Sequence, residues 1–417
     1  MALEKIFDIL TEQPKKSDFN QNNTTKDKKL NEQIIEKSKH LRDKIKKDKN
    51  IEFIDMIYDD DFTTIYNRCC ENILGYRKVP MGVSHNPVII NYKSFYIPIC
   101  TFEGALVASM CRGIKLINKS NGVLGFVENL GITRSFALDF CNFETACKFY
   151  QWIKLNENIN LLKNEGNKNS RYCRIKKIEC KNMYGSIVFI KVSAFTGDAM
   201  GMNMITKACN QIASKIIEMF KNTKLVTISA NICTDKKWSI ENYCNGRGKK
   251  VFLHIKIKEV DLKSIMHVTI DDILKVYHTK IVLGGSIVLG GFNCQASNYV
   301  AATFLAFNQD LGHVLESSNC TIDMKKNNDC LEVNLLMPSV IVGTVGGGTH
   351  LEPACSLFKQ FKNLENSFNI NHIEDLSKES NHLALLVATS VLAGELSAMS
   401  SLAENTLMDA HLRLNRK

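Results

Sequence analysis

The sequence predicts an α+β fold, and three observations indicate it. Residues 185–195 form an apolar, β-rich run, and the apolar side chains of 204–220 then recur every three or four positions, as on one face of a helix. Residues 135–226 as a whole contain two strand–helix–strand halves, an order typical of a split βαβ, or ferredoxin-like, sheet. Residues 381–412 carry the apolar stripe of one long helix.

Composition limits the classes of function. A chain of 417 residues is long enough for two or three domains. Its 15 cysteines are scattered without zinc-ligand spacing, which predicts reduced thiols, a cytoplasmic protein and no metal site. The net charge of +10 suits an anionic ligand such as a nucleotide or CoA, whereas no basic patch interleaved with aromatic residues favours nucleic acid. The longest apolar run, residues 383–394, is too short to span a bilayer of ~30 Å.

The elements follow in order along the chain. Residues 1–50 carry 13 Lys and Arg against 9 Asp and Glu, which predicts a flexible segment to about residue 31 and an exposed helix at 32–49. Residues 51–70 are more apolar and are expected to begin the folded body. Short strands at 71–101 precede a helix from Gly104. The remaining predictions are helices at 143–156, 262–276 and 293–308, and strands at 170–176, 224–229, 251–260 and 331–336.

Two glycine-rich turns and one polar loop are candidate binding elements. Residues 196–203 join the strand at 185–195 to its helix, and this junction is either a tight turn or a place where a ligand approaches the helix N-terminus. Residues 343–349 contain three consecutive glycines. The polar loop 229–237 is either a solvated turn or a site.

Three titratable residues are open to both a structural and a functional interpretation. As structural residues, Glu103 would be a capping charge at a helix start, Asp310 would cap a helix terminus, and His411 would interact with a helix dipole.

A series of motifs favours the functional interpretation. In chain order they are CCENILGY (69–76), FEGALVAS (102–109), GITR (131–134), SRY (170–172), GDAMGMNM (197–204), CTDKK (233–237), NGRGK (245–249), GGFN (290–293), NQD (308–310), SSNC (317–320), GTVGGGT (343–349) and AGELSAM (393–399).

This series resembles the 3-hydroxy-3-methylglutaryl-CoA reductase family of eukaryotes and archaea, in its catalytic part without a membrane domain. The resemblance implies NADPH-dependent reduction of a thioester by two hydrides to mevalonate and CoA, the committed step of the mevalonate route to isoprenoids and sterols. It implies that Lys236 stabilises the negative charge that develops on the carbonyl oxygen, and that Glu103 is the proton donor there. Asp310 would hydrogen-bond both of them, and His411 would protonate the CoA thiolate.

Binding roles follow from the same resemblance. Arg134, Ser229, Asp235, Lys237 and Lys280 match positions that hold the hydroxymethylglutaryl group, with His278 as the alternative to Lys280. Asn298 matches an active-site asparagine, and Ser109 and Arg112 match CoA contacts. The implied NADPH-binding residues are Ser170, Arg171, Tyr172, Asp198, Met200, Gly201, Met202, Asn203, Gly346 and Gly347. Arg171 would lie near the ribose 2′-phosphate, and Asp198 would contact the ribose or the nicotinamide amide.

The resemblance also implies the architecture. A basic flexible segment (1–50) and a helical piece (51–70) would precede a large substrate domain (71–134 and 239–417) built round a long central helix within 293–308. A small ferredoxin-like NADPH-binding domain (135–226) would be inserted, and a catalytic loop (227–238) would return to the large domain. Active sites would lie between the subunits of a dimer or tetramer. A membrane anchor preceding the chain would place it at the cytosolic face of the endoplasmic reticulum.

The sequence departs from the family pattern at a few positions. Cys111, Ala230, His267 and Asn308 stand where relatives carry other residues, which predicts altered CoA contacts more than altered chemistry. Three hypotheses are therefore compared: an active reductase, a non-catalytic relative that keeps the fold, and a basic scaffold driven by residues 1–50. Retention of Glu103, Lys236, Asp310 and His411 together favours the reductase.

Overall fold

The computed structural model describes residues 24–52, 54–288, 291–362, 364, 369–370 and 376–406. The chain divides into two compact units, residues 1–79 and 80–417, with the cut near the start of the predicted substrate domain. His411, the N-terminal 23 residues and Gly290 lie outside the described residues, and so does the predicted helical stretch beyond 406.

The first unit is built on helix α2 (Thr24–Lys49) and a two-stranded pair of β1 (Met56–Ile57) with β2 (Tyr76–Arg77). Arg42 of the helix donates to the Leu74 carbonyl (2.7 Å), and its guanidinium lies 4.1 Å from the ring centroid of Tyr58. The Asn31 side chain accepts from the Phe62 N–H (2.9 Å). These contacts hold residues 51–79 to the helix.

Two predictions for this unit are wrong. Residues 24–31, expected to be flexible, belong to α2, where Asp27 in the first turn and lysines in the last turn complement the helix dipole. Residues 51–70, expected to be helical, form turns and β1 within the part of the chain that is described. Their apolar side chains, such as the buried Phe62, pack on α2 and its neighbours instead of forming a second helical face.

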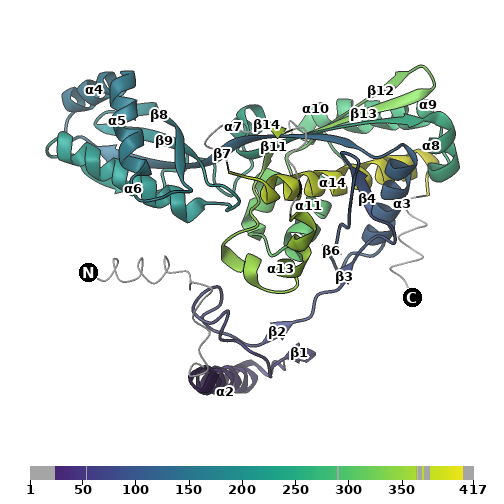
Figure 1. The fold of residues 1–417 in the computed structure, drawn as a ribbon, viewed down its shortest axis with the longest axis horizontal. Coiled ribbons are helices and arrows are strands. Elements are labelled where there is room, and N and C mark those ends of the chain that lie inside the picture. Colours follow the sequence, from purple (N-terminus) through teal and green to yellow (C-terminus); the bar gives the residue numbers. More distant parts are fainter. Residues whose placement is uncertain are drawn as a thin grey trace. The chain divides into compact units, whose positions relative to one another are not determined.

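The second unit contains one large mixed sheet (Figure 1). Its strands lie in the order β12 (Thr321–Asn327), β13 (Cys330–Val340), β11 (Gly248–Lys258), β7 (Leu124–Asp139), β9 (Ile187–Phe195) and β8 (Arg174–Tyr184). Two further strands pair with β7: β10 (Lys224–Thr227), antiparallel, and β14 (Asn369–Ile370), parallel.

Strand β7 connects two halves of this sheet. Its first part pairs with β11 as far as Gly131↔Gly248, and its second part pairs with β9 from Ile132↔Ala194 onward. The predicted domain boundary at 134/135 therefore falls inside one continuous strand. The sequence concealed this strand because glycines interrupt its apolar pattern at 125 and 131.

Residues 132–220 form a hydrophobic core of their own around the second half of the sheet. Helices α4 (Phe143–Trp152), α5 (Asn156–Asn167) and α6 (Met202–Met219) contribute buried side chains to it, together with β7, β8 and β9. Phe140 and Phe149 stack in this core with ring centroids 4.6 Å apart. Burial of such rings supplies much of the free energy that orders the segment.

The long central helix is α14 (Glu379–Glu404), not the predicted segment 293–308. Every residue of α14 from Ser380 to Ser401 is buried, and the helix lies against β7, β11 and β13 on one side and α3 (Leu106–Lys119) and α11 (Ala296–Ala306) on the other (Figure 1). A Cβ at Gly394 would lie 1.8 Å from the Tyr299 ring, so the glycine lets α11 approach closely. The small residues at 296–306 therefore mark a helix that packs on the central one.

The helix α14 is long and apolar enough to cross a membrane, yet its apolar window is fully buried inside the fold. Among the described residues no other helix has that length and composition. Its apolar character is accounted for by its place at the centre of the core.

The remaining elements surround this frame. The short strands are β3 (Met81–Gly82), β4 (Val88–Ile90), β5 (Lys93–Phe95) and β6 (Ile99–Cys100). The short helices are α7 (Ile240–Asn245), α8 (Glu259–Met266), α9 (Ile270–Val276), α10 (Gly285–Val288), α12 (Val314–Ser317) and α13 (Ala354–Leu357). A π-helical segment spans Tyr277–Gly284, and 3₁₀ turns span Leu311–His313, Gly347–His350 and Phe358–Phe361.

Most predicted elements are present with shifted ends. One exception is the helix predicted at 262–276, which is broken in two at His267 (φ 60°). Thr269 then begins α9 with a capping box to Asp272. The apolar period alone could not reveal that break, because the stripe continues across it.

Candidate active site

The loop 227–238 is held in one conformation by the helix that follows it. The Asn242 side chain, buried in α7, donates to the carbonyls of Thr234 and Lys237 (both 3.3 Å). Thr234 and Lys236 themselves have positive φ values of 58° and 55°. Non-glycine residues seldom adopt that conformation unless their surroundings impose it, so the loop is a constrained element.

Lys236 and Asp310 form an ion pair, Nζ to Oδ2, at 2.8 Å. Asp310 also accepts from the Gly312 N–H (2.9 Å) at the start of the 3₁₀ turn Leu311–His313, so its capping role exists beside the ion pair. Burial raises the pKa of the Asp310 carboxyl, but the hydrogen bonds from Lys236 and Gly312 outweigh it, and the pKa lies below its usual value. The carboxylate is therefore held ionised next to the ammonium group.

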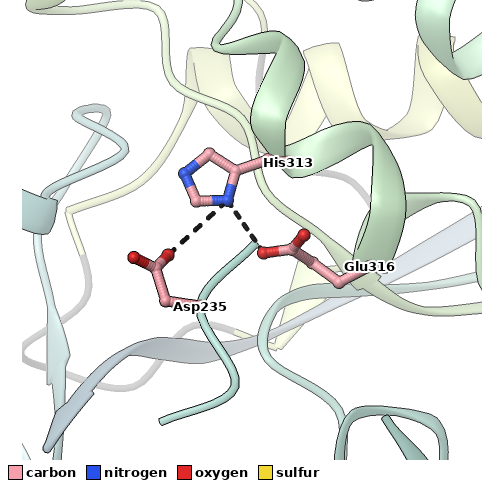
Figure 2. Close-up of side chains that lie close together, drawn as sticks. All are labelled: Asp235, His313 and Glu316. Atoms are coloured by element: carbon pink, nitrogen blue, oxygen red, sulfur yellow. Dashed lines mark hydrogen bonds and ion pairs between the residues drawn. The ribbon is translucent and has the colours of Figure 1, made fainter. Parts of the chain in front are cut away.

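A cluster of buried charges lies beneath this pair. The Arg247 guanidinium, 1 % exposed, donates to Glu316 Oε1 (2.7 Å) and to Asp235 Oδ1 (3.0 Å). Glu316 Oε1 also accepts from the Lys236 backbone N–H (3.1 Å) and lies 2.8 Å from His313 Nδ1 (Figure 2). Arg134 pairs with the other oxygen of Asp235 at 3.4 Å. The backbone of Lys236 is thus bound directly to a fully buried carboxylate.

Sequence reasoning missed three members of this cluster: Arg247, His313 and Glu316. Arg247 stands in the NGRGK motif, and Glu316 immediately precedes SSNC, but neither was assigned a role. The sequence could have indicated these residues as charged positions within otherwise apolar or turn-forming segments. Arginine and glutamate are seldom fully buried without partners, so charged residues in such segments predict a buried ion pair.

Asp235, His313 and Glu316 place their ligand-type atoms within 4.8 Å of one another, as a metal site would require. A guanidinium group already lies between the two carboxylates, however, at 2.7 and 3.0 Å. A divalent cation would be repelled by it, so Arg247 is the cation that this carboxylate pair binds.

Glu103 forms no ion pair with Lys236 in the described part of the chain. It is exposed and precedes α3, and its carboxylate makes no hydrogen bond or ion pair with another described residue. The predicted contact between Glu103 and Asp310 stays a prediction. The predicted contact between Asp310 and Lys236 is present.

Ser109 and Arg112 of α3 are bound to α14. The Ser109 hydroxyl hydrogen-bonds Ser397 Oγ (2.9 Å), and Arg112 donates to the Ser397 carbonyl (2.6 Å) and to the Ser401 hydroxyl. Burial lowers the pKa of the Arg112 guanidinium below its usual value. Both predicted CoA contacts thus also fasten two core helices together.

The other predicted substrate residues are spread round the same unit. Ser229 and Lys237 are exposed on the 227–238 loop, and Asn298 donates to the Gln295 side chain (3.2 Å). Lys280 is exposed in the π-helical segment, where its charge acts on Glu395, a fully buried carboxylate that the sequence analysis did not single out. Burial raises the pKa of Glu395 against hydrogen bonds from the N–H groups of 294 and 295.

The two glycine-rich turns lie side by side. Ala199 forms a β-bridge with Val345, and the Thr344 N–H donates to the Asp198 carbonyl (2.8 Å). Gly346 and Gly347 have φ values of 87° and 59°, and a Cβ at either would meet no atom within 4 Å. Helix α6 begins beside them without a side-chain cap. An uncapped helix N-terminus next to open glycine backbone is suited to an anionic ligand.

Asp198 has a structural role that the sequence analysis did not foresee. Its Oδ1 accepts hydrogen bonds from the N–H groups of Lys378 (2.8 Å) and Ser380 (2.9 Å) and from the Ser380 hydroxyl (2.9 Å). A carboxylate at this place satisfies the free donors at the start of α14 and complements its dipole. Of the other predicted cofactor residues, Arg171 and Tyr172 are exposed, and Ser170 Oγ accepts from the N–H of Cys173 (2.9 Å).

The glycine turns are joined to the charged cluster by two contacts. Arg247 lies 3.1 Å from the Met202 sulfur at the start of α6, and the Gly343 N–H donates to the Gln309 side chain (2.9 Å), next to Asp310. Asn308 has a φ of 51° and donates to the carbonyls of Gly348 and Leu351. Asparagine tolerates this conformation better than most residues, so Asn308 both forms the turn and ties it to the glycine loop.

The protein has an α+β fold. Its candidate site combines a lysine–aspartate ion pair, a cluster of buried charges and a helix N-terminus beside glycine-rich backbone. A family model described as hydroxymethylglutaryl-coenzyme A reductase matches residues 33–416. The chain belongs to the hydroxymethylglutaryl-coenzyme A reductase family.

Individual relatives agree with this. The chain is 37% identical over 367 residues to 3-hydroxy-3-methylglutaryl-coenzyme A reductase of Schizosaccharomyces pombe, covering 86% of this chain and 34% of that protein. It is 37% identical over 361 residues to reductase 2 of Dictyostelium discoideum, with coverages of 86% and 67%. The chain thus spans about a third of the length of one relative and two thirds of the other.

The fold is shared with a solved structure. The class II 3-hydroxy-3-methylglutaryl-CoA reductase from Streptococcus pneumoniae, bound to NADPH in open conformations, superposes with a TM-score of 0.61 at 17% identity. The match covers 80% of this chain and 87% of that one.

Proposed function

We propose that the protein reduces 3-hydroxy-3-methylglutaryl-CoA to mevalonate. One thioester, two NADPH and two protons give one alcohol, one CoA thiol and two NADP⁺. The observation that carries the proposal is the ion pair between Lys236 and Asp310. Lys236 lies on a constrained loop that contacts a cluster of buried charges, and the chain belongs to the reductase family. A solvated surface turn needs neither the positive φ at Lys236 nor its anchor on Glu316.

Each reduction step places negative charge on the carbonyl oxygen of the substrate. Lys236 is the fixed cation that stabilises this charge, because Asp310 and the loop hold it before the reaction begins. Glu103 supplies the proton to that oxygen, and His411, outside the described residues, supplies the proton to the departing CoA thiolate. Separate donors are needed because the oxygen and the sulfur lie on different sides of the reacting carbon.

The acyl group and CoA are held by the cationic and polar residues that the resemblance identified. Lys237 and Lys280 are exposed cations suited to the free carboxylate of the substrate, and Ser229 is an exposed hydroxyl. Arg134 and Asp235 act from within the buried cluster. Ser109 and Arg112 bind CoA at the edge of α3, where they also contact α14.

NADPH binds along the turn 198–203 and the glycines 346 and 347, and it supplies the hydride. The open backbone at Gly346 and Gly347 and the uncapped start of α6 fit a dinucleotide phosphate. The surrounding strands support an inserted ferredoxin-like domain, since β7, the helix pair α4 and α5, β8, β9, α6 and β10 follow one another, and the sheet order is β10-β7-β9-β8. This is a βαββαβ order in which two helices form the first crossover. Because Oδ1 of Asp198 caps α14, only its other oxygen remains for the cofactor.

Replacing Arg171 with alanine tests the choice of cofactor. Arg171 is exposed beside Ser170, and a guanidinium there pairs with the ribose 2′-phosphate that only NADPH carries. We expect KM for NADPH to rise about tenfold or more, and KM for NADH to change little. Initial rates with both cofactors measure this, with Lys168→Ala as the control, because Lys168 already pairs with Glu165. Equal effects on both cofactors would remove Arg171 from the phosphate site.

The active site is completed by a second copy of the chain. The Glu103 carboxylate forms no ion pair with Lys236 within the described part of its own chain, although the chemistry requires it near that lysine. A dimer or tetramer would bring the Glu103 of one subunit to the Lys236 of another.

Absorbance at the NADPH band tests the reaction itself. We expect two NADPH consumed for each molecule of thioester, with release of one free thiol, in a preparation whose native mass is at least that of a dimer. A non-catalytic relative or a scaffold would consume none. One NADPH per thioester would indicate reduction that stops at the aldehyde, and an active monomer would refute the shared site.

A further inference from the structure

We propose that His313 is a positioning residue, whose Nε2 atom governs how Asp310 engages Lys236. The inference rests on the proposed function, because it concerns the same ion pair. It adds a titratable group to the site that neither the resemblance nor the motifs assign.

His313 is almost completely buried, with 1% of its surface exposed, in the 3₁₀ turn that Asp310 begins. Its Nδ1 lies 2.8 Å from Glu316 Oε1. Its Nε2 is buried without a hydrogen-bond partner among the described residues and lies 3.7 Å from Asp310 Oδ2. That is the same carboxylate oxygen that pairs with Lys236 at 2.8 Å.

The surroundings fix which ring nitrogen carries a proton in the neutral imidazole. Glu316 Oε1 already accepts from Arg247 NH1 (2.7 Å) and from the Lys236 N–H (3.1 Å), as an ionised carboxylate does. A carboxylate oxygen cannot donate, so His313 Nδ1 must be the donor to it. The proton that His313 gains or loses is therefore the one on Nε2, facing Asp310.

The charged groups around the ring set the consequence of that proton. Glu316 faces it from α12, Asp310 from the 3₁₀ turn and Asp235 from the 227–238 loop, with Oδ1 3.8 Å from Nδ1. Arg247 and Arg134 lie behind these carboxylates and neutralise part of their charge. Lys236 faces the ring only through Asp310.

Without a proton on Nε2, the nitrogen lone pair faces Oδ2, and Asp310 is directed to Lys236. With the proton, Oδ2 is shared between the imidazolium and the ammonium group. The hold on Lys236 weakens, and the cation is less well placed for the carbonyl oxygen. His313 thereby governs how firmly Asp310 Oδ2 holds the ammonium group of Lys236.

Two substitutions separate the two ring nitrogens. His313→Asn places an amide N–H near the Nδ1 position and keeps the donor to Glu316, but removes the group that faces Asp310. His313→Gln places its amide near the Nε2 position and keeps a non-titrating polar group there. We expect His313→Asn to lower kcat at least tenfold with KM changed less than twofold, and His313→Gln to retain most of the rate. Recovery of the rate in His313→Gln but not in His313→Asn would show that the atom facing Asp310 is the one the reaction depends on.

A purely structural histidine would give another result. Activity and melting temperature would then fall together in both variants. Equal losses of kcat in His313→Asn and His313→Gln, in step with their losses of stability, would therefore overturn the proposal.

Ring titration by NMR tests the contact without any turnover, so it remains informative even if the reductase assay is blank. The chain has 10 histidines, and loss of one signal in His313→Gln assigns the ring. Removing the neighbouring carboxylate with Asp310→Asn should lower the titration midpoint of this ring, and Lys236→Ala should raise it. Unchanged midpoints in both variants would show that Nε2 does not sense the pair, and would refute the proposal whatever the enzyme does.

Discussion

Replacing Lys236 with alanine is expected to lower kcat for thioester reduction by about 10²–10³-fold or more, the cost of losing one preorganised donor to an oxyanion. The reason lies in how the residue is held. Its Nζ is fixed by Asp310 at 2.8 Å, and its backbone N–H by the buried Glu316 at 3.1 Å. A cation held in this way needs no reorganisation as charge develops, so its contribution belongs to the transition state. We therefore expect kcat and kcat/KM to fall together.

The chain provides a matched control in Lys326. It is exposed to a similar degree, 44% against 47% for Lys236, and it pairs with Asp271 at 2.9 Å. Lys326→Ala removes the same charge and the same kind of ion pair from an edge strand remote from the loop, and should leave the rate of NADPH oxidation unchanged. An equal loss in both variants would mean that net charge, not position, is what the reaction needs.

The sequence was informative where function rests on short segments. Motif order brought Lys236 and Asp310 into one hypothesis although 73 residues separate them, and the structure places them in contact. It also related the turn 198–203 to the glycines 346 and 347, and the Ala199–Val345 bridge joins these segments. Glycines and charged residues at turns are visible in one sequence because the backbone requires them locally.

The same reasoning failed where the outcome depended on long-range packing. Asp198 was expected at the cofactor, but which free helix N-terminus it would meet depended on where α14 begins, and its partner Ser380 in that helix stands 182 residues later. The central helix was assigned to 293–308 because small residues indicate close packing between helices. Small residues occur on both helices of such a contact, however, so they do not show which of the two is central. The buried cluster joins β7, the 227–238 loop, the turn before β11 and α12, and no local pattern relates four such segments.

Removing either partner of the buried Arg247–Glu316 pair is expected to destabilise the fold by about 3–5 kcal/mol, because an uncompensated charge is left in the interior. Glu316→Leu leaves Arg247 NH1 and the Lys236 N–H without their acceptor, and removes the partner of His313. Arg247→Met leaves Glu316 and Asp235 facing each other without the guanidinium. Denaturant unfolding followed by circular dichroism measures both, with Glu218→Leu, from an exposed pair with Lys215, as a control worth about 1 kcal/mol or less.

The double variant Arg247→Met/Glu316→Leu separates a coupled pair from two independent residues. It removes both charges and replaces them with side chains that fill apolar space. We expect its loss of stability to be smaller than the sum of the single losses by about 1–3 kcal/mol, as contacting residues show. The recovered stability would not restore activity, because the Lys236 N–H would still lack its buried acceptor. Strictly additive losses of stability would mean that water solvates the Arg247 and Glu316 side chains independently. The buried pair would then not hold the loop that carries Lys236 in place.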